Sequence, residues 1–426
     1  MFGTRWQCYR PNRKHFGSQM VRTTVRIIVL FNIVCFLCFC CTSSPNWLAS
    51  GLKKMAGNGI QIAKDSTGRI LKNSKLFMKP DCQKDIVIFG MRPHWRQFCF
   101  EMFACKSLVE FPRHFRCPEM ECSITLDYTE EARKIRNFDV VVFTNVYPWI
   151  TDDMWDWLHS NRTHAQRWVI VSEESPINAG GFQLPEKYAD VTFDWIASYK
   201  TDSEFRQPYG RYEPFPEDEI KSELDLEIYL KNKTNVVSWM GSNCDKRLQT
   251  VRELESMIQL KKYGKCGDFE LPWEDYNALF NLLNTFKFYL SFENSCCDDY
   301  ITEKFWRTLD MGVVPVVMGA TAEQYANVAP PNSFIHVEEF TSLSELVNYL
   351  MELNANNEKY LEYFQWKKTG KVISLSQQEQ YIRPLKDSTY CSILKKYLHE
   401  SPRNQRKIEY FGPQWVGSCR ECPSLP

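Results

Sequence analysis

The chain has 426 residues, of which 44% are hydrophobic and 14% aromatic, and its 52 basic side chains balance its 52 acidic ones. This length suits two or three domains with sizeable cores. A net charge of zero disfavours the function classes that depend on a strongly basic surface, nucleic-acid binding above all.

The N-terminus combines a basic segment with an apolar one. Residues 1–26 hold several arginines and no acidic residue, and residues 27–41 are almost entirely apolar. This run is shorter than the ~20 residues of a typical membrane span, but Arg22 and Arg26 can place their charges at the interface and lengthen the helix. We interpret 1–26 as a cytosolic tail and 27–45 as a signal-anchor transmembrane helix. A cleaved signal peptide is the alternative.

Most of the cysteines lie beyond this apolar run, in the part of the chain that the anchor would place in the lumen. A lumenal compartment is oxidising and favours disulfides, whose pairing the sequence does not give. Cys391 is one disulfide candidate. Cys419 and Cys422 form a lone Cys-x-x-Cys motif, which we interpret as a local C-terminal staple rather than a redox or zinc site.

Two further patterns agree with a lumenal location. His114, Cys117 and Cys122 are residue types that bind zinc, but the oxidising compartment favours disulfides for these cysteines as well. Asn161 and Asn232 each begin an Asn-x-Thr triplet, the acceptor pattern for N-linked glycosylation. Both asparagines are therefore candidate glycosylation sites.

The next part of the chain changes from a stem to an α/β unit. Residues 46–83 are rich in Ser, Gly, Lys and Asn, and we interpret them as a flexible stem. From residue 84 onward, short apolar runs alternate with helix-like segments. That alternation is typical of a parallel sheet covered on both faces. The first unit, 84–215, has expected strands at 85–90, at 138–144 and at the start of 167–176.

A second α/β unit is expected over residues 235–385, and a disulfide-stapled C-terminal segment over 386–426. The spacing of Leu248, Val251, Leu254 and Ile258 predicts an amphipathic helix. The expected elements are a strand and turn at 235–243, this helix at 245–260, strands at 286–292, 313–319 and 333–340, and one or two helices at 342–368. Ligands of such sheets bind at the carboxyl ends of the strands.

The stretch 288–306, "FYLSFENSCCDDYITEKFW", places polar residues at such a strand end. Glu293, Asn294 and Ser295 follow the apolar run directly, and Glu303 and Lys304 fall near the first turn of the next helix. A helix N-terminus favours anions, and an adjacent lysine strengthens that preference. The alternative is an ordinary solvated Glu-Lys face.

Two other strand ends share this arrangement. Gly241 ends one strand and lets backbone approach a ligand closely, and Arg247 falls at the start of the following helix. Neither a GxGxxG nor a GxxxxGK[ST] motif is present in the sequence, which disfavours Rossmann-type dinucleotide sites and P-loops. Glu173 and Glu174 end a strand of the first unit and are candidate general bases. Surface charge is the alternative for each of these side chains.

The segment 286–363 resembles the donor-binding half of the α1,3-fucosyltransferases, glycosyltransferase family 10. "FYLSFENS…DYITEKFWRTLDMGVVPVVMG" is similar to that family's signature, and "VVSWMGSNC…R…VRELE" followed by "YGKCG" resembles its second donor motif. "SEESP" followed by "DVTFDWIASYKTDSEFRQPYG" resembles its acceptor-side segment. The likeness covers roughly residues 84–370 and is nearest to the invertebrate enzymes that act on N-glycans.

This resemblance implies an α/β fold of the GT-B type, with two Rossmann-like domains facing a central cleft after a single N-terminal membrane anchor. It implies an inverting transfer of L-fucose from GDP-β-L-fucose to the 3-OH of GlcNAc in N-glycans, on the core or on an antenna. Glu174 would be the general base, and Arg247 and Lys304 would hold the diphosphate. The remaining donor-binding residues would be Glu303, Asn294, Ser295, Tyr300 and Gly241.

The implied enzyme is a single-pass type II protein of the Golgi membrane with a lumenal catalytic part. Its partners would be GDP-fucose, an N-glycan or N-acetyllactosamine acceptor and the membrane, without nucleic acid. "CDDY" lacks the spaced Asp-x-Asp of metal-dependent sugar transferases, so we expect no obligatory metal or other cofactor, and stimulation by Mn²⁺ or Mg²⁺ stays open. Two alternatives are a protein O-fucosyltransferase of the same fold and an inactive lumenal glycan-binding or scaffold protein.

Overall fold

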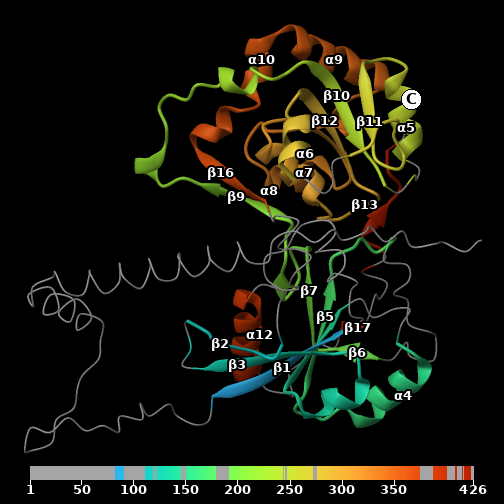
Figure 1. Ribbon diagram of the computed structural model, residues 1–426, viewed down its shortest axis with the longest axis vertical. Coiled ribbons are helices and arrows are strands. Elements are labelled where there is room, and N and C mark those ends of the chain that lie inside the picture. The colour runs from blue at the N-terminus through green and yellow to red at the C-terminus, as the bar shows by residue number, and fades with distance from the viewer. Residues whose placement is uncertain are drawn as a thin grey trace, which may run out of the picture. The chain divides into compact units, whose positions relative to one another are not determined.

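The first half of the described chain forms a seven-stranded sheet in the order β2-β3-β1-β4-β5-β7-β8 (Figure 1). The computed structural model describes residues 82–90, 111–178 without 119, 121 and 145–149, 191–374 without 243, 245, 246 and 272–275, 387–400, 408–409, 415 and 417–423. All strand pairs in this sheet are parallel except β2 with β3. The strands are β1 (Gln83–Gly90), β2 (Arg113–Arg116), β3 (Ser123–Thr129), β4 (Val140–Thr144), β5 (Arg167–Ser172), β7 (Trp195–Ser198) and β8 (Phe205–Arg206).

Side chains of these strands alternate between two hydrophobic clusters, one on each face of the sheet. Successive residues of a strand point to opposite faces, so Ile86 and Ile88 of β1 join one cluster while Val87 and Phe89 join the other. The first cluster includes side chains of α12 (Asp387–His399), and the second includes side chains of η1 (Ala132–Asn137) and α4 (Asp152–Asn161). A helix near the C-terminus therefore completes the core of the first sheet.

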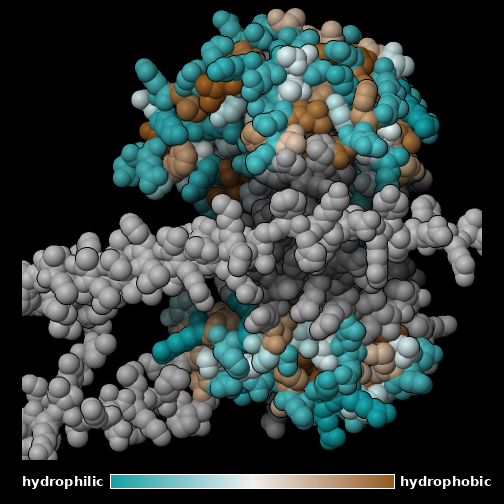
Figure 2. All heavy atoms as spheres, in the orientation of Figure 1, coloured by the Kyte–Doolittle hydropathy of each residue, from teal (hydrophilic) through white to brown (hydrophobic). Residues whose placement is uncertain are grey.

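The second sheet has five parallel strands in the order β11-β10-β12-β14-β15. Its strands are β10 (Asn235–Met240), β11 (Leu260–Tyr263), β12 (Phe286–Phe292), β14 (Val314–Met318) and β15 (Ile335–His336). Its helices are α5 (Arg247–Glu255), α6 (Tyr276–Leu283), α7 (Glu303–Asp310), α8 (Ala322–Val328), α9 (Leu343–Ala355) and α10 (Asn357–Glu362). The face of this part of the chain seen in Figure 2 is mainly hydrophilic, with hydrophobic residues scattered over it.

Three short antiparallel pairs join segments that lie far apart in the sequence. They are β6 (Thr192–Phe193) with β17 (Ile408–Glu409), β9 (Gly210–Pro214) with β16 (Gly370–Ser374), and β13 (Cys296–Cys297) with β18 (Cys419–Arg420). Four short 3-10 helices complete the described elements: η3 (Glu217–Glu219), η4 (Glu227–Tyr229), η5 (Val337–Glu339) and η6 (Gln365–Lys368).

The α/β prediction with parallel sheets is confirmed, and one detail of it is wrong. The strand expected at 333–340 is only Ile335–His336, because the chain turns into η5 directly afterwards. The one or two helices predicted at 342–368 are confirmed as α9 and α10, which are divided at Asn356; its side chain accepts a hydrogen bond from the Lys359 backbone N–H and caps α10. The predicted tail at 1–26, the anchor at 27–45 and nearly all of the stem lie outside the described residues. Within the described part of the chain, no helix is long and apolar enough to cross a membrane.

Five disulfides join the described cysteines, which confirms the prediction that the chain contains disulfide bonds. They are Cys82–Cys122, Cys117–Cys391, Cys244–Cys266, Cys296–Cys422 and Cys297–Cys419. The local staple predicted between Cys419 and Cys422 is wrong, since each pairs with one of two adjacent cysteines more than a hundred residues earlier. The zinc alternative for the cluster at His114 is also wrong, since both of its cysteines are oxidised.

Candidate active site

Strand β12 ends at a carboxylate that is enclosed by protein. Glu293 follows the strand directly and has 0% of its surface exposed. Its Oε1 accepts hydrogen bonds from the Thr302 backbone N–H at 2.7 Å and the Thr302 Oγ1 at 2.9 Å. Its Oε2 lies 3.1 Å from the Nζ of Lys304. The start of α7 therefore folds back onto the end of β12 and neutralises its buried charge.

The charges around Lys304 keep this lysine protonated. Burial opposes its positive charge, but the neighbouring Glu293 and Glu303 outweigh that effect and raise the pKa of Lys304. Burial raises the pKa of Glu293, although Lys304 pulls it down. Burial also works against the ionised form of Glu303, but Lys304, at 3.3 Å, and Arg307 lower its pKa overall. A fixed positive charge is thus maintained at the N-terminus of α7.

A second cation reaches the same strand end from α5. Arg247 is the first residue of this helix, is buried, and donates from Nη1 to the backbone oxygen of Phe292 at 3.0 Å. Its charge lowers the pKa of Lys304 in part, which is expected only of nearby cations. The two positive side chains that the sequence singled out therefore lie close together, at the end of β12.

Gly241 occupies the turn that precedes Arg247. A side chain at this position would meet the ring of Trp239, so the turn has room for glycine only. Its backbone oxygen accepts a hydrogen bond from Cys266 at 3.0 Å, and the disulfide Cys244–Cys266 closes the same turn. The end of β10 is consequently tied to the end of β11.

The strand end of β5 carries a carboxylate with a different set of partners. Glu174 is half-buried, and its Oε1 accepts hydrogen bonds from the Tyr300 hydroxyl at 2.5 Å and the Asn294 amide at 3.2 Å. The Ser175 backbone N–H also donates to this oxygen, at 2.8 Å. Two of the three donors thus come from the loop between β12 and α7, which connects the candidate base to the second sheet.

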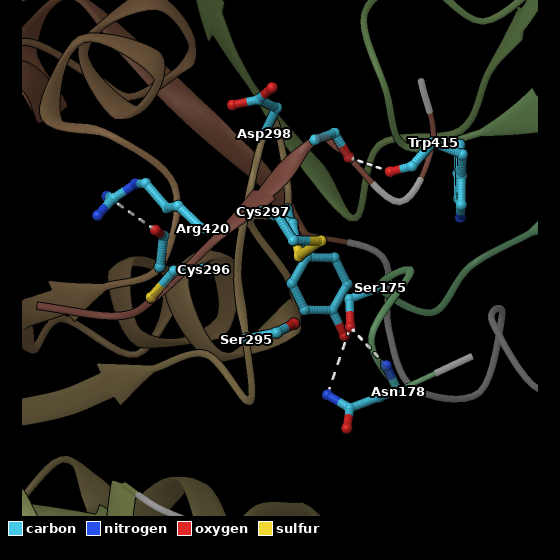
Figure 3. The surroundings of a disulfide bond; sticks show 12 residues. Ser175, Asn178, Ser295, Cys296, Cys297, Asp298, Trp415 and Arg420 are labelled. Carbon is cyan, nitrogen blue, oxygen red and sulfur yellow. Dashed lines mark hydrogen bonds between the residues drawn. A yellow bond between two sulfur atoms is a disulfide. The ribbon is translucent and has the colours of Figure 1, made fainter. Parts of the chain in front are cut away.

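The same loop holds Ser295, the last of the predicted donor-binding residues. Ser295 is buried and donates from Oγ to the side-chain oxygen of Asn294 at 3.0 Å. Figure 3 shows Ser295 beside the disulfide cysteines and on the side of the loop that faces Ser175 and Asn178. The amide of Asn178 also donates to the backbone oxygen of Asn294, at 3.4 Å. The side chains of Asn294 and Tyr300 contact Glu174, and their binding of donor stays a prediction.

Sequence reasoning gave no role to Tyr209, which lies where the carboxylates gather. Burial raises the pKa of the Tyr209 hydroxyl, and nearby negative charges raise it further: Glu173, Glu303, Glu174 and Glu293. This hydroxyl donates to the backbone oxygen of Glu173. Burial raises the pKa of the Glu173 carboxyl itself to about 7, although its side chain reaches solvent. The motif "QPYG" was part of the resemblance but carried no chemical signal that marks its tyrosine.

Glu293 and Thr302 were also missed as partners of Lys304. The position of Glu293 directly after a buried strand was the available signal, because charges at such a point need a nearby partner. Thr302, just before the helix, is a residue type typical of an N-cap, although its side chain contacts Glu293 instead.

The two predicted glycosylation sites differ in their surroundings. Asn232 is exposed, between η4 and β10. Asn161 is the last residue of α4, is half-buried, and donates from its amide to the backbone oxygen of Trp157 at 2.8 Å. Asn232 is therefore the more accessible acceptor, and glycosylation at both sites stays a prediction.

Two family profiles match most of the described chain. "Glycosyltransferase family 10 (fucosyltransferase) C-term" matches residues 230–411, and "Fucosyltransferase, N-terminal" matches residues 83–210. In structure, the chain is similar to a crystal structure of an α1,3-fucosyltransferase with a TM-score of 0.46 and 15% identity, over 81% of this chain and 95% of that one.

Similar curated proteins come from insects and mammals. Glycoprotein 3-alpha-L-fucosyltransferase A of Drosophila melanogaster is 40% identical over 47% of this chain and 40% of its own length. The bovine 3-galactosyl-N-acetylglucosaminide 4-alpha-L-fucosyltransferase FUT3 is 38% identical over 51% of this chain and 57% of its own length, so the match spans about half of either protein. The human 4-galactosyl-N-acetylglucosaminide 3-alpha-L-fucosyltransferase FUT6 is 34% identical over 61% of this chain and 70% of its own length. The chain therefore belongs to glycosyltransferase family 10, the fucosyltransferases, as its strand-end motifs predicted.

Proposed function

We propose that the chain is an inverting α1,3-fucosyltransferase that moves L-fucose from GDP-β-L-fucose to the 3-OH of GlcNAc in N-glycans. The observation that carries the proposal is the pair of adjacent residues Glu293 and Asn294. The first contacts Lys304, and the second contacts Glu174. Two adjacent residues thus contact a cation that can hold a diphosphate and a carboxylate that can take a proton.

In the proposed reaction, Glu174 accepts the proton of the acceptor hydroxyl while that oxygen forms a bond to C1 of fucose. The bond between C1 and the β-phosphate oxygen breaks on the opposite face, and GDP leaves with the bonding electrons. The configuration at C1 is inverted in this single displacement. A sugar hydroxyl is a weak nucleophile at neutral pH, and removal of its proton by a positioned carboxylate contributes roughly 10²–10⁴-fold.

Arg247 and Lys304 would stabilise the charge that grows on the leaving diphosphate. Fixed cations in a site that excludes water act more strongly on the transition state than on the ground state. The planar guanidinium suits two phosphoryl oxygens, and the ammonium acts as a point charge. Two cations supply a charge balance that a metal supplies in other sugar transferases, so no obligatory cofactor is proposed.

The names of the similar proteins support the proposed acceptor. The Drosophila relative is named as acting on glycoproteins, and the mammalian relatives are named for galactosylated N-acetylglucosamine. We propose a GlcNAc of an N-glycan as the acceptor, either in the core or on an antenna. We also propose a Golgi location with the catalytic part in the lumen, and the disulfides support an oxidising compartment of this kind.

The two alternatives are less well supported. Membership of family 10 disfavours a protein O-fucosyltransferase. Glu174 contacts Asn294, and Lys304 contacts the adjacent Glu293. This arrangement disfavours an inactive glycan-binding or scaffold protein, which has no need of a base beside buried cations.

The test uses the full-length chain, produced in membranes of cells that lack α1,3-fucosyltransferase activity. These membranes are incubated with GDP-fucose and with N-glycans that differ in the presence of antennary galactose. We expect mass spectrometry and linkage analysis to find fucose on O-3 of a GlcNAc, and partial digestion to assign it to the core or to an antenna. Transfer to folded polypeptide domains alone, or to no acceptor while GDP-fucose stays intact, would overturn the proposal.

A further inference from the structure

The loop between β12 and α7 is anchored on one side by a C-terminal segment, residues 417–423. Disulfides join Cys296 to Cys422 and Cys297 to Cys419, and β13 pairs with β18 with Cys296 opposite Arg420 and Cys297 opposite Cys419. The backbone N–H of Asp298 continues the pairing by donating to Ser418 at 2.8 Å. Figure 3 shows the Asp298 side chain pointing away from Ser175 and Asn178, which lie near the candidate base.

The next residue, Asp299, faces the first sheet instead. Its Oδ2 accepts two hydrogen bonds from Thr201, one from the backbone N–H at 2.9 Å and one from Oγ1 at 2.6 Å. Thr201 lies just beyond β7, the strand that pairs with β5, whose end carries Glu174. The loop is therefore held at both ends of a three-residue stretch, by one disulfide at Cys297 and by two hydrogen bonds at Asp299.

The backbone of Asp299 is in the left-handed region, with φ of 60°. This conformation is uncommon for residues other than glycine, although aspartate tolerates it better than most. It turns the chain so that consecutive side chains diverge. Asp299 reaches Thr201, and the hydroxyl of Tyr300 reaches Glu174. The Tyr300 ring also packs edge-on against Tyr199, two residues before Thr201, at 5.0 Å between ring centroids.

We propose that Asp299 and Thr201 are positioning residues for the candidate base, acting through Tyr300. Two hydrogen bonds on one carboxylate oxygen hold Asp299 in its unusual conformation. That conformation aims the Tyr300 hydroxyl at Glu174, where it orients the carboxylate for proton transfer. The inference rests on the proposed function, because it explains how Glu174 is oriented for the proton transfer proposed above.

Removal of the hydrogen bonds should lower turnover without changing donor binding. Thr201→Val removes the Oγ1 hydrogen-bond donor at nearly constant side-chain volume. Asp299→Ala removes the carboxylate and therefore both hydrogen bonds from Thr201. We expect Thr201→Val to lower kcat by about 3- to 10-fold and Asp299→Ala by more than about 10-fold, since a lost hydrogen bond is commonly worth up to one order of magnitude. The KM for GDP-fucose should change less than about twofold, and Thr201→Ser should restore most of the lost turnover.

The matched control is the neighbouring aspartate. Asp298→Ala removes an acid from the same loop, but its Oδ1 accepts from Gln324 at 3.1 Å rather than from the first sheet. It should leave kcat nearly unchanged. Thermal unfolding of all variants in the full-length chain shows whether a lower kcat reflects loss of folded protein.

A double-mutant cycle separates positioning from general damage. In a Tyr300→Phe background the hydroxyl is gone, so Thr201→Val and Asp299→Ala should produce little further loss of kcat. Losses that multiply fully in that background, or an unchanged kcat in the single variants, would overturn the inference. Full activity of Glu174→Gln would instead contradict the proposed function itself, so the two failures can be told apart.

Discussion

The carboxylates at the ends of β5 and β12 occupy equivalent places in their sheets and have opposite surroundings. Glu293 has no exposed surface, and its partners Thr302 and Lys304 lie within eleven residues of it along the chain. Glu174 is half-buried, and its partners Asn294 and Tyr300 come from 120 and 126 residues away. Glu293 is enclosed by residues close to it in the sequence, whereas Glu174 receives hydrogen bonds from a loop that is distant in the sequence.

This difference separates two tasks that a single acid cannot perform together. A carboxylate sealed behind Thr302 and Lys304 cannot reach the hydroxyl of a substrate, but it can hold a lysine in place and keep that lysine charged. A carboxylate that keeps access to solvent can accept a proton from an incoming acceptor. Its hydrogen-bond donors from the other sheet fix its orientation. The site therefore combines a fixed cation and an accessible base.

The largest expected effect is on turnover when the accessible carboxylate loses its charge. Glu174→Gln keeps the size of the side chain and removes its ability to accept a proton. We expect kcat to fall roughly 10²–10⁴-fold while GDP still binds. The melting temperature should change little, because Glu174 is partly exposed and makes no ion pair among the described residues. Transfer rates and GDP binding by calorimetry measure the two quantities.

Glu173→Gln is the matched control, since it removes the neighbouring carboxylate at the same strand end. Its turnover should stay within about tenfold of the wild-type value. If Glu174→Gln leaves turnover unchanged, Glu174 is not the general base, and the two strand ends do not differ in the way described above.

The second effect concerns the enclosed pair. Lys304→Ala leaves Glu293 buried without its cation, and loss of one partner of a buried pair commonly costs about 3–5 kcal/mol of stability. The same change should lower kcat/KM for GDP-fucose, because the diphosphate loses a fixed positive charge. Thermal unfolding and donor kinetics measure the two losses separately.

A double variant separates the structural role of Lys304 from its role toward the donor. In Lys304→Met with Glu293→Gln, the fully enclosed side chain is neutral and Glu303 keeps the nearby charge of Arg307, so most of the lost stability should return. Donor kcat/KM should stay low. If donor use recovers together with stability, Lys304 only supports the fold and the assignment to the diphosphate is wrong.

The local half of the site could be predicted from the sequence, and the non-local half could not. Arg247 starts the helix that follows β10, and Lys304 lies in the first turn of the helix that follows β12, so the sequence placed each near the carboxyl end of a parallel strand. The partners of Glu174 are set by the packing of two sheets, which no local pattern encodes. The same reason explains the error at Cys419 and Cys422, whose short spacing suggested a local bond while the fold brought Cys296 and Cys297 beside them.

The fold shows the same division between local and non-local information. Continuous apolar runs predicted the central strands β1, β4, β5, β10, β12 and β14, because strands covered on both faces leave little room for polar residues. The position of α12 against the first sheet was not predicted. Tyr390, Ile393 and Leu394 of α12 join the hydrophobic cluster on one face of the sheet, and that face exists only once the strands are assembled.

The smallest effect should appear as a pH dependence beside the accessible base. Burial raises the pKa of Glu173 to about 7, so its carboxyl is neutral below that pH and negative above it. The new charge lies close to Tyr209, which also senses Glu303 near Lys304. A negative charge at this place opposes a diphosphate. We therefore expect the KM for GDP-fucose to rise by a few-fold as the pH passes upward through about 7, with the size limited by solvent screening.

Glu173→Gln should remove this dependence, because glutamine stays neutral over the whole range. Donor KM measured from pH 5.5 to 8.5 should then be flat in the variant and should match the wild-type value found at low pH. All other titratable groups are the same in both proteins, so a rise that persists in the variant must come from a group other than Glu173. In that case Glu173 lies too far from the donor to affect its KM, and Glu174 is the only carboxylate at the end of β5 that takes part in the reaction.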